Sequence, residues 1–143
     1  MRFRPLGESG TAVSAITLTL DASVAATGAS NIRELVYGAL EEGVNSFHID
    51  SLDPTLIRTA GQALAEVDRD LLQISLIIGP LPNGRRDFSV EGVNAVLGAV
   101  LNASGLRYLD AVIMDDPAEN ELPAQTLKML REDERILRLG IRG

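Results

Sequence analysis

Several side chains that could do acid–base or metal chemistry come near the ends of expected strands. His48 is the only histidine in the chain, and Asp50 follows two residues later. A histidine among carboxylates offers a proton-transfer group and the ligands that divalent cations take. The spacing matches no known cation-binding loop, so we expect no resident metal. The candidate ligands, should a cation bind, are His48, Asp50, Asp115 and Asp116.

Each polar residue also has a simpler structural interpretation, which we prefer. His48 is a strand residue that would be hydrogen-bonded near the end of a sheet. Asp53 precedes Pro54, the pattern of a helix N-cap followed by proline at the first helical position. The Arg85–Arg86 pair could hold an anion, but a solvated pair in a loop is the expected arrangement.

Apolar runs alternate with amphipathic segments along the chain, which predicts alternating strands and helices. A hairpin of residues 2–6 and 11–14 comes first, turning at Gly7–Gly10. The expected strands are 15–20, 44–50, 71–78, 108–114 and 136–141. The expected helices are 31–42, 54–64, 90–104 and 123–131, and residues 21–29 are expected to form a loop.

Capping residues set several of these helix boundaries. Asn31 and Glu34 form a capping-box pattern at the start of the first helix, and Gly43 stops it. Ser89 is expected to cap the third helix and Gly105 to end it. The continuous apolar run at 71–78 predicts a strand covered on both faces.

Buried strands joined by amphipathic helices predict an α/β fold with a parallel sheet and right-handed crossovers. We expect one domain over residues 1–143. The chain ends at Gly143, just after the fifth expected strand, whereas a closed eight-stranded barrel needs about 250 residues. The expected architecture is therefore a half TIM-type barrel of about five parallel strands and four helices.

Composition argues against several classes of partner. The formal net charge of -7 opposes binding to nucleic acid or to anionic membranes. The chain has no cysteine, which excludes disulfides and Cys-ligated zinc and fits a reducing cytoplasm. No signal peptide and no apolar run long enough to span a membrane is expected.

Short stretches along the whole chain resemble aldo-keto reductases, in the sugar-dehydrogenase-like branch of that family. They include Arg4-Pro5-Leu6-Gly7, 39–45, Ile78-Gly79-Pro80, Tyr108-Leu109-Asp110 and 138–141. Their order and spacing carry the resemblance, which covers only the first half of the family's barrel. It implies carbonyl reduction with NADPH, using an Asp, a Tyr, a Lys and a His at the C-terminal rim of the barrel.

The catalytic positions implied by this resemblance carry the wrong residues. The preferred alignment places His48, Asp53, Ile77 and Asp115 at the Asp, Tyr, Lys and His positions. An alternative register makes Asp50 the catalytic Asp, but it places Thr55 at the Tyr position. We therefore expect no catalytic residue here.

The cofactor positions differ as well. Thr17 and Thr19 stand where the family has glycines beside the nicotinamide, and Arg142-Gly143 replaces the Ser-Asn pair that holds the cofactor's amide. We expect no bound cofactor.

Three functions remain open. The preferred one is a non-catalytic structural or interaction module that self-associates, most simply as a homodimer, because an unclosed barrel leaves two sheet edges unpaired. The second is an NADP-dependent oxidoreductase that uses non-standard residues or is completed by another half. The third is a small-ligand or metal-binding protein.

Overall fold

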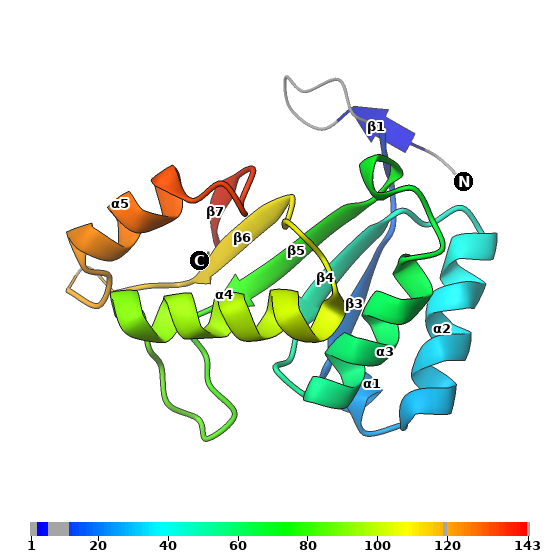
Figure 1. Cartoon of the computed structure of the whole chain (residues 1–143), viewed down its shortest axis with the longest axis horizontal. Helices are drawn as coiled ribbons and strands as arrows, with labels where there is room; N and C mark the ends of the chain where they lie inside the picture. The colour runs from blue at the N-terminus through cyan, green and yellow to red at the C-terminus, as the bar shows by residue number, and fades with distance from the viewer. Residues whose placement is uncertain (1–2, 6–11, 119, 143) are drawn as a thin grey trace.

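Five parallel strands form the central sheet of this computed structural model, which describes residues 3–5, 12–118 and 120–142. The strands follow the chain in the order β3-β4-β5-β6-β7 (Figure 1). They are β3 Thr17–Asp21, β4 Ser46–Asp50, β5 Gln73–Ile78, β6 Ala111–Asp115 and β7 Leu139–Arg142. All five expected strands are present, and their ends differ from the expected ones by no more than three residues.

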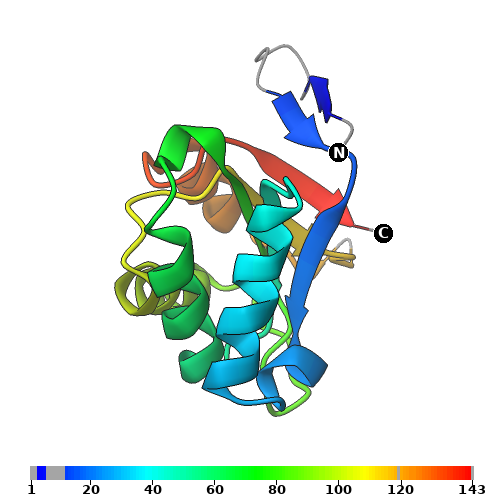
Figure 2. The same cartoon turned by 90° about the vertical axis from the view of Figure 1, so that its right-hand side faces the viewer.

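Helices follow the strands as expected. They are α2 Ala29–Glu41, α3 Pro54–Leu64, α4 Val90–Ser104 and α5 Ala124–Glu132. These helices lie on one side of the sheet, and the other side is left bare by the described residues (Figure 2). The predicted α/β class is therefore confirmed. No helix in the described part of the chain is long and apolar enough to cross a membrane.

The N-terminal hairpin pairs β1 (Phe3–Pro5) with β2 (Ala12–Ser14) in antiparallel register. Its expected turn at 7–10 lies outside the described residues. The Ser14 amide donates to Asn45 Oδ1 at 2.7 Å, which ties the hairpin to the chain just before β4. The hairpin therefore sits where the strands of the sheet begin (Figure 1).

Two predictions about the segment after β3 are wrong. Residues expected to be a loop contain a short helix, α1 (Ala22–Ala25), because the Asp21 carboxylate accepts a hydrogen bond from the Val24 amide and caps it. The capping box at Asn31 is also absent. Helix α2 begins earlier, after Gly28, and the Asn31 side-chain amide donates to the Thr27 carbonyl instead.

Other helix ends are as predicted. Asp53 caps α3, accepting from the Leu56 amide at 2.9 Å, and Pro54 is its first residue. Ser89 caps α4 through the Gly92 amide at 3.0 Å. Gly105 ends α4 with a φ of 77°, a left-handed conformation that glycine adopts without a Cβ clash.

The core lies between the sheet and the helices. Alternate strand side chains point into it, and the fully buried ones include Leu20, Phe47, Ile74, Leu76 and Met114. The intervening side chains face the bare side and are mainly polar, including Thr17, Thr19, Ser46, His48 and Ser75. The bare face therefore resembles a protein surface more than the branched apolar interior of a closed barrel.

Strand β5 is buried as expected for a strand covered on both faces, but side chains and not a second layer of helices cover its bare face. Helices cover only one of its faces, yet Gln73 and Ile77 on the bare face are 7% and 6% exposed. Arg138, next to β7, donates to Gln73 Oε1 at 3.4 Å. The arginine thus reaches over the bare face from two strands away and helps to cover it.

Candidate site at the carboxyl ends of the strands

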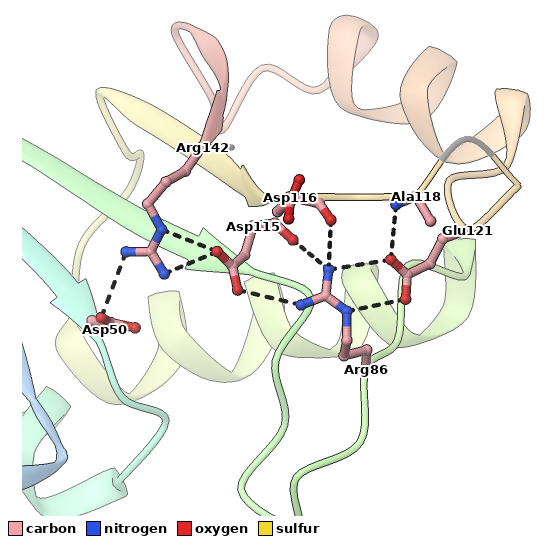
Figure 3. Close-up of polar contacts among 7 residues, drawn as sticks. All are labelled: Asp50, Arg86, Asp115, Asp116, Ala118, Glu121 and Arg142. Carbon is pink, nitrogen blue, oxygen red and sulfur yellow. Dashed lines mark hydrogen bonds and ion pairs between the residues drawn. The ribbon is translucent and has the colours of Figure 1, made fainter.

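An arginine from the last strand joins two carboxylates at the carboxyl edge of the sheet. Arg142 Nη2 and Nε each lie 3.0 Å from Asp115 Oδ1 on the neighbouring strand. Arg142 Nη1 lies 3.8 Å from Asp50 Oδ2 on β4 (Figure 3). Parallel strands bring their carboxyl ends to one edge, which is why residues so far apart in sequence meet.

This contact also reports the shape of the sheet. Strands β4 and β7 are separated by β5 and β6, yet one arginine side chain bridges them across the bare face. A flat sheet would place the two strands about 14 Å apart, at roughly 4.8 Å per strand. The bare face is therefore concave, as the inside of a barrel is.

A second arginine holds the neighbouring loops. Arg86, in the β5–α4 loop, contacts the Glu121 carboxylate through Nε at 3.0 Å and Nη2 at 3.2 Å. It also reaches Asp115 Oδ2 at 3.3 Å and donates to the carbonyls of Asp115 and Asp116 (Figure 3). Arg86 is exposed, as expected for a loop arginine, but it is ion-paired within the chain, which the expectation of a solvated pair did not include. For Arg85, the described residues show no side-chain hydrogen bond or ion pair.

These contacts shift the pKa values of the partners. Hydrogen bonding to Arg86 lowers the pKa of Glu121, which also accepts from the Ala118 amide at 3.1 Å. The hydrogen bond to Glu121, and to a smaller extent the one to Asp115, raises the pKa of Arg86. Asp116, whose carbonyl Arg86 binds, has a φ of 41° and is the only non-glycine residue with a positive φ among those described. Arg86 therefore helps to fix the strained turn that follows β6.

His48 does not join this network. It lies on β4, on the bare face, and its Nδ1 is 2.7 Å from Ser75 Oγ on the adjacent strand. Burial lowers the pKa of His48, the nearby Asp50 carboxylate acts in the opposite direction, and the positive charge of Arg142 lowers the pKa as well. A neutral imidazole hydrogen-bonded to a strand neighbour matches the structural interpretation given to His48 above.

The remaining expected positions are also occupied by structural residues. Asp53 is the cap of α3, and Ile77 is a buried strand residue. The structure brings Asp50 and Asp115 together through Arg142 but leaves His48 and Asp53 outside that contact. Among the described residues, no group of three or more His, Asp or Glu side chains is arranged to hold a metal ion.

Neither tyrosine of the chain lies near the carboxyl strand ends. Tyr108 comes before β6, where the Arg69 guanidinium stacks 4.0 Å from the centre of its ring. Tyr37 is on α2, and the only lysine, Lys128, is exposed on α5. A phenol beside an ammonium group is therefore not available at this edge of the sheet.

A cleft of about 590 Å³ opens beside the network. It lies between α1, the β4–α3 loop and the β5–α4 loop, and its lining includes Ala22, Asp50, Asp53, Ile77 and Pro80. Sequence analysis named both carboxylates of this lining, Asp50 and Asp53, but it missed α1, which forms one wall and whose only sequence signal is its N-cap Asp21.

The role of Arg142 could not be found from sequence patterns. It comes at the end of a short strand, and its partners are 27 and 92 residues earlier in the chain. Arg86 was visible as one of a pair of basic residues, but nothing in the pair distinguishes the ion-paired Arg86 from Arg85.

Comparison with known proteins identifies the fold. No protein-family model and no curated protein matches the sequence. Among solved structures, the chain is similar to aldo-keto reductase AKR11C1 from Bacillus halodurans in its holo form, with a TM-score of 0.75 and 20% sequence identity. The match covers 99% of this chain and 50% of that one, so this chain spans about half the length of the protein it matches. The expected half-barrel fold is confirmed: the structure is an α/β fold matching half of an aldo-keto reductase TIM barrel.

Proposed function

We propose that this chain is a non-catalytic relative of the aldo-keto reductases that acts as a self-associating structural or interaction module. The observation that carries the proposal is the contact of Arg142 with Asp115 and Asp50. It places ion-paired groups at the strand ends where a carbonyl reductase needs a proton donor and an open nicotinamide site.

The chemistry of carbonyl reduction supports a loss of catalysis. Hydride transfer to a carbonyl produces an alkoxide that must be protonated, and a phenol beside a cation can supply that proton. At the resembling positions, Asp53 is a helix cap and Ile77 has no charge. Asp115, at the position of the family's histidine, is bound by Arg142. None of these three side chains is a phenol, the proton donor that carbonyl reduction uses in the family.

The cofactor positions support the same conclusion. Thr17 and Thr19, where the family has glycines, place side chains on the bare face of β3. The Arg142 side chain crosses this face from the position of the family's Ser-Asn pair. We therefore propose that no NADPH binds.

Unpaired sheet edges support self-association. Strands β3 and β7 form the two edges of the sheet in the described chain. Apolar side chains are exposed at or next to these edges: Ile16 is 59% exposed, Leu137 58% and Ile141 67%. Strand edges with exposed apolar side chains favour pairing with another chain, and a second copy is the simplest partner.

Two measurements test the proposal. Calorimetric titration with NADPH should give no signal, and light scattering should give the mass of a dimer at micromolar concentration. Micromolar NADPH binding would refute the loss of the cofactor site. A monomer throughout the micromolar range would refute self-association, whatever the calorimetric result.

A second candidate is an oxidoreductase that is completed by another half. The observation in its favour is that the similar reductase is twice as long as the matched region. In that case NADPH would bind only after a complementary chain is added. Titration of the isolated chain with and without such a partner distinguishes the two proposals.

A further inference from the structure

The two edges of the sheet differ in how well they are protected against pairing. Strand β3 has the sequence Thr-Leu-Thr-Leu-Asp, with β-branched threonines on the bare face and no charge before its last residue. Natural edge strands are usually protected by charges, prolines or bulges. Strand β3 has none of these at Thr17–Leu20, and Ile16 just before it is exposed.

We propose that β3 pairs with β3 of a second copy in antiparallel register, so that the two sheets form one continuous ten-stranded sheet. The inference rests on the self-association proposed above and names its surface. In Figure 2, β3 (blue) runs along the right-hand side of the molecule, and the helices lie to its left.

The side-chain pattern selects one register. Residues directly opposite each other in an antiparallel pair point to the same face. With the helices of both copies on one side, the pairing that overlaps all five residues is centred on Thr19. It places Thr19 opposite Thr19 of the second copy, and Leu18 opposite Leu20.

This register brings no like charges together. Asp21, the only charged residue of β3, lies opposite Thr17 of the second copy. Thr–Thr and aliphatic pairs directly opposite each other are favourable cross-strand contacts. Strand β7 is shorter, with four residues, and it carries the charged Arg142 at its end and Arg138 just before it, so β7 is the better protected edge.

The half-buried Leu18 adds an apolar contribution. It packs against the core from the helix side of β3 and remains partly exposed. Pairing with Leu20 of a second copy would cover the remaining apolar surface of Leu18, which favours association.

The register can be tested by charge complementation at Thr19. Thr19→Lys and Thr19→Asp each place two like charges opposite one another, so each should weaken the dimer about fivefold or more in sedimentation equilibrium. An equimolar mixture of the two variants should regain wild-type affinity as a heterodimer, visible by native mass spectrometry. Both variants should remain folded, because Thr19 is exposed in the single chain.

Thr17→Lys is the matched control. It adds the same charge to the same face two residues away, but there the lysine meets Asp21 of the second copy, so the dimer should be as tight as the wild type or tighter. Two outcomes would refute this interface while leaving self-association intact. One is that both Thr19 variants dimerise with the affinity of the wild type. The other is that their mixture associates no more tightly than either variant alone. A monomeric wild type would instead refute the proposed function itself.

Discussion

The Arg142 guanidinium lies 3.8 Å from the Asp50 carboxylate, although two other strands lie between the strand of Arg142 and the strand of Asp50. The contact exists because the sheet is concave, and it closes part of the open face at the carboxyl edge. Its energetic weight is modest, since the Arg142 side chain is half exposed.

We expect Arg142→Ala to lower the free energy of unfolding by no more than about 1 kcal/mol, because partly exposed ion pairs are screened by solvent. Urea denaturation followed by circular dichroism measures this. A loss several times larger would mean that the bridge, and not the helix-side core, holds the curvature of the sheet.

The ion pair at the opposite end of the sheet should matter more. Asp110 is 5% exposed, lies 2.7 Å from Arg69 Nη2 and accepts from the Ile74 amide at 2.8 Å. Asp110→Ala removes the carboxylate partner of Arg69, which keeps its hydrogen bonds to the Leu72 and Tyr108 carbonyls, and leaves the buried Ile74 amide without an acceptor. The free energy of unfolding should therefore fall by about 2 kcal/mol. The exposed Asp70→Ala is the control and should stay within about 0.5 kcal/mol of the wild type.

A close helix contact provides another matched pair of variants. A Cβ at Gly61 of α3 would overlap the carbonyl oxygen of Ser104 on α4, so Gly61→Ala should destabilise the fold by about 1–3 kcal/mol. A Cβ at Gly98 of α4 would meet only open space. Gly98→Ala should therefore raise the free energy of unfolding by up to about 1 kcal/mol, because alanine has the higher helix propensity. Thermal unfolding of both variants checks the contrast; equal effects would contradict the close approach of the two helices.

His48 should make stability depend on pH. Burial lowers its pKa in the folded protein, so below about pH 6.5 the unfolded chain binds a proton more readily than the folded one. The stabilisation that comes from neutral His48 should therefore be complete above about pH 6.5. It should be lost as the pH falls from there toward the lower pKa of His48 in the folded protein. In His48→Gln the fall between pH 7 and 5.5 should largely disappear; an unchanged slope in urea titrations would assign it to other groups.

Divalent cations should not stabilise the protein. The carboxylate of Asp115 is bound by Arg86 and Arg142, and no described group of three ligands surrounds a cation position. Any ion that binds only the folded state raises Tm. We expect no change in Tm with Mg²⁺ or Mn²⁺ in differential scanning fluorimetry, and a rise that His48→Ala abolishes would show a metal site instead.

Local signals predicted much of this fold. Asp53-Pro54, Ser89 and Gly105 marked helix ends correctly, because each acts on backbone groups within a few residues. The capping-box pattern at Asn31 was misleading, since the helix had already begun after Gly28. Helix α1 was missed because its residues are small and only Asp21 marks its start.

The candidate site was less predictable than the fold. Arg142 meets Asp50, and Arg69 meets Asp110, only after the strands are placed side by side and the sheet has curved. A pattern within one segment contains no information about such contacts. Sequence analysis named side chains near the expected strand ends, but their partners come from elements far away in the chain.

The polar lining of the bare face has a thermodynamic consequence. Thr17, Thr19 and other hydroxyl-bearing side chains there are at least partly hydrated in the folded protein. Apart from the buried Ile77 and the half-buried Ile113, unfolding therefore uncovers little hydrocarbon from that side of the sheet. Exposed hydrocarbon dominates the heat capacity increment of unfolding, which averages about 12–15 cal/mol/K per residue in globular proteins. This chain should therefore fall below that average, and its stability should vary with temperature along a flatter curve.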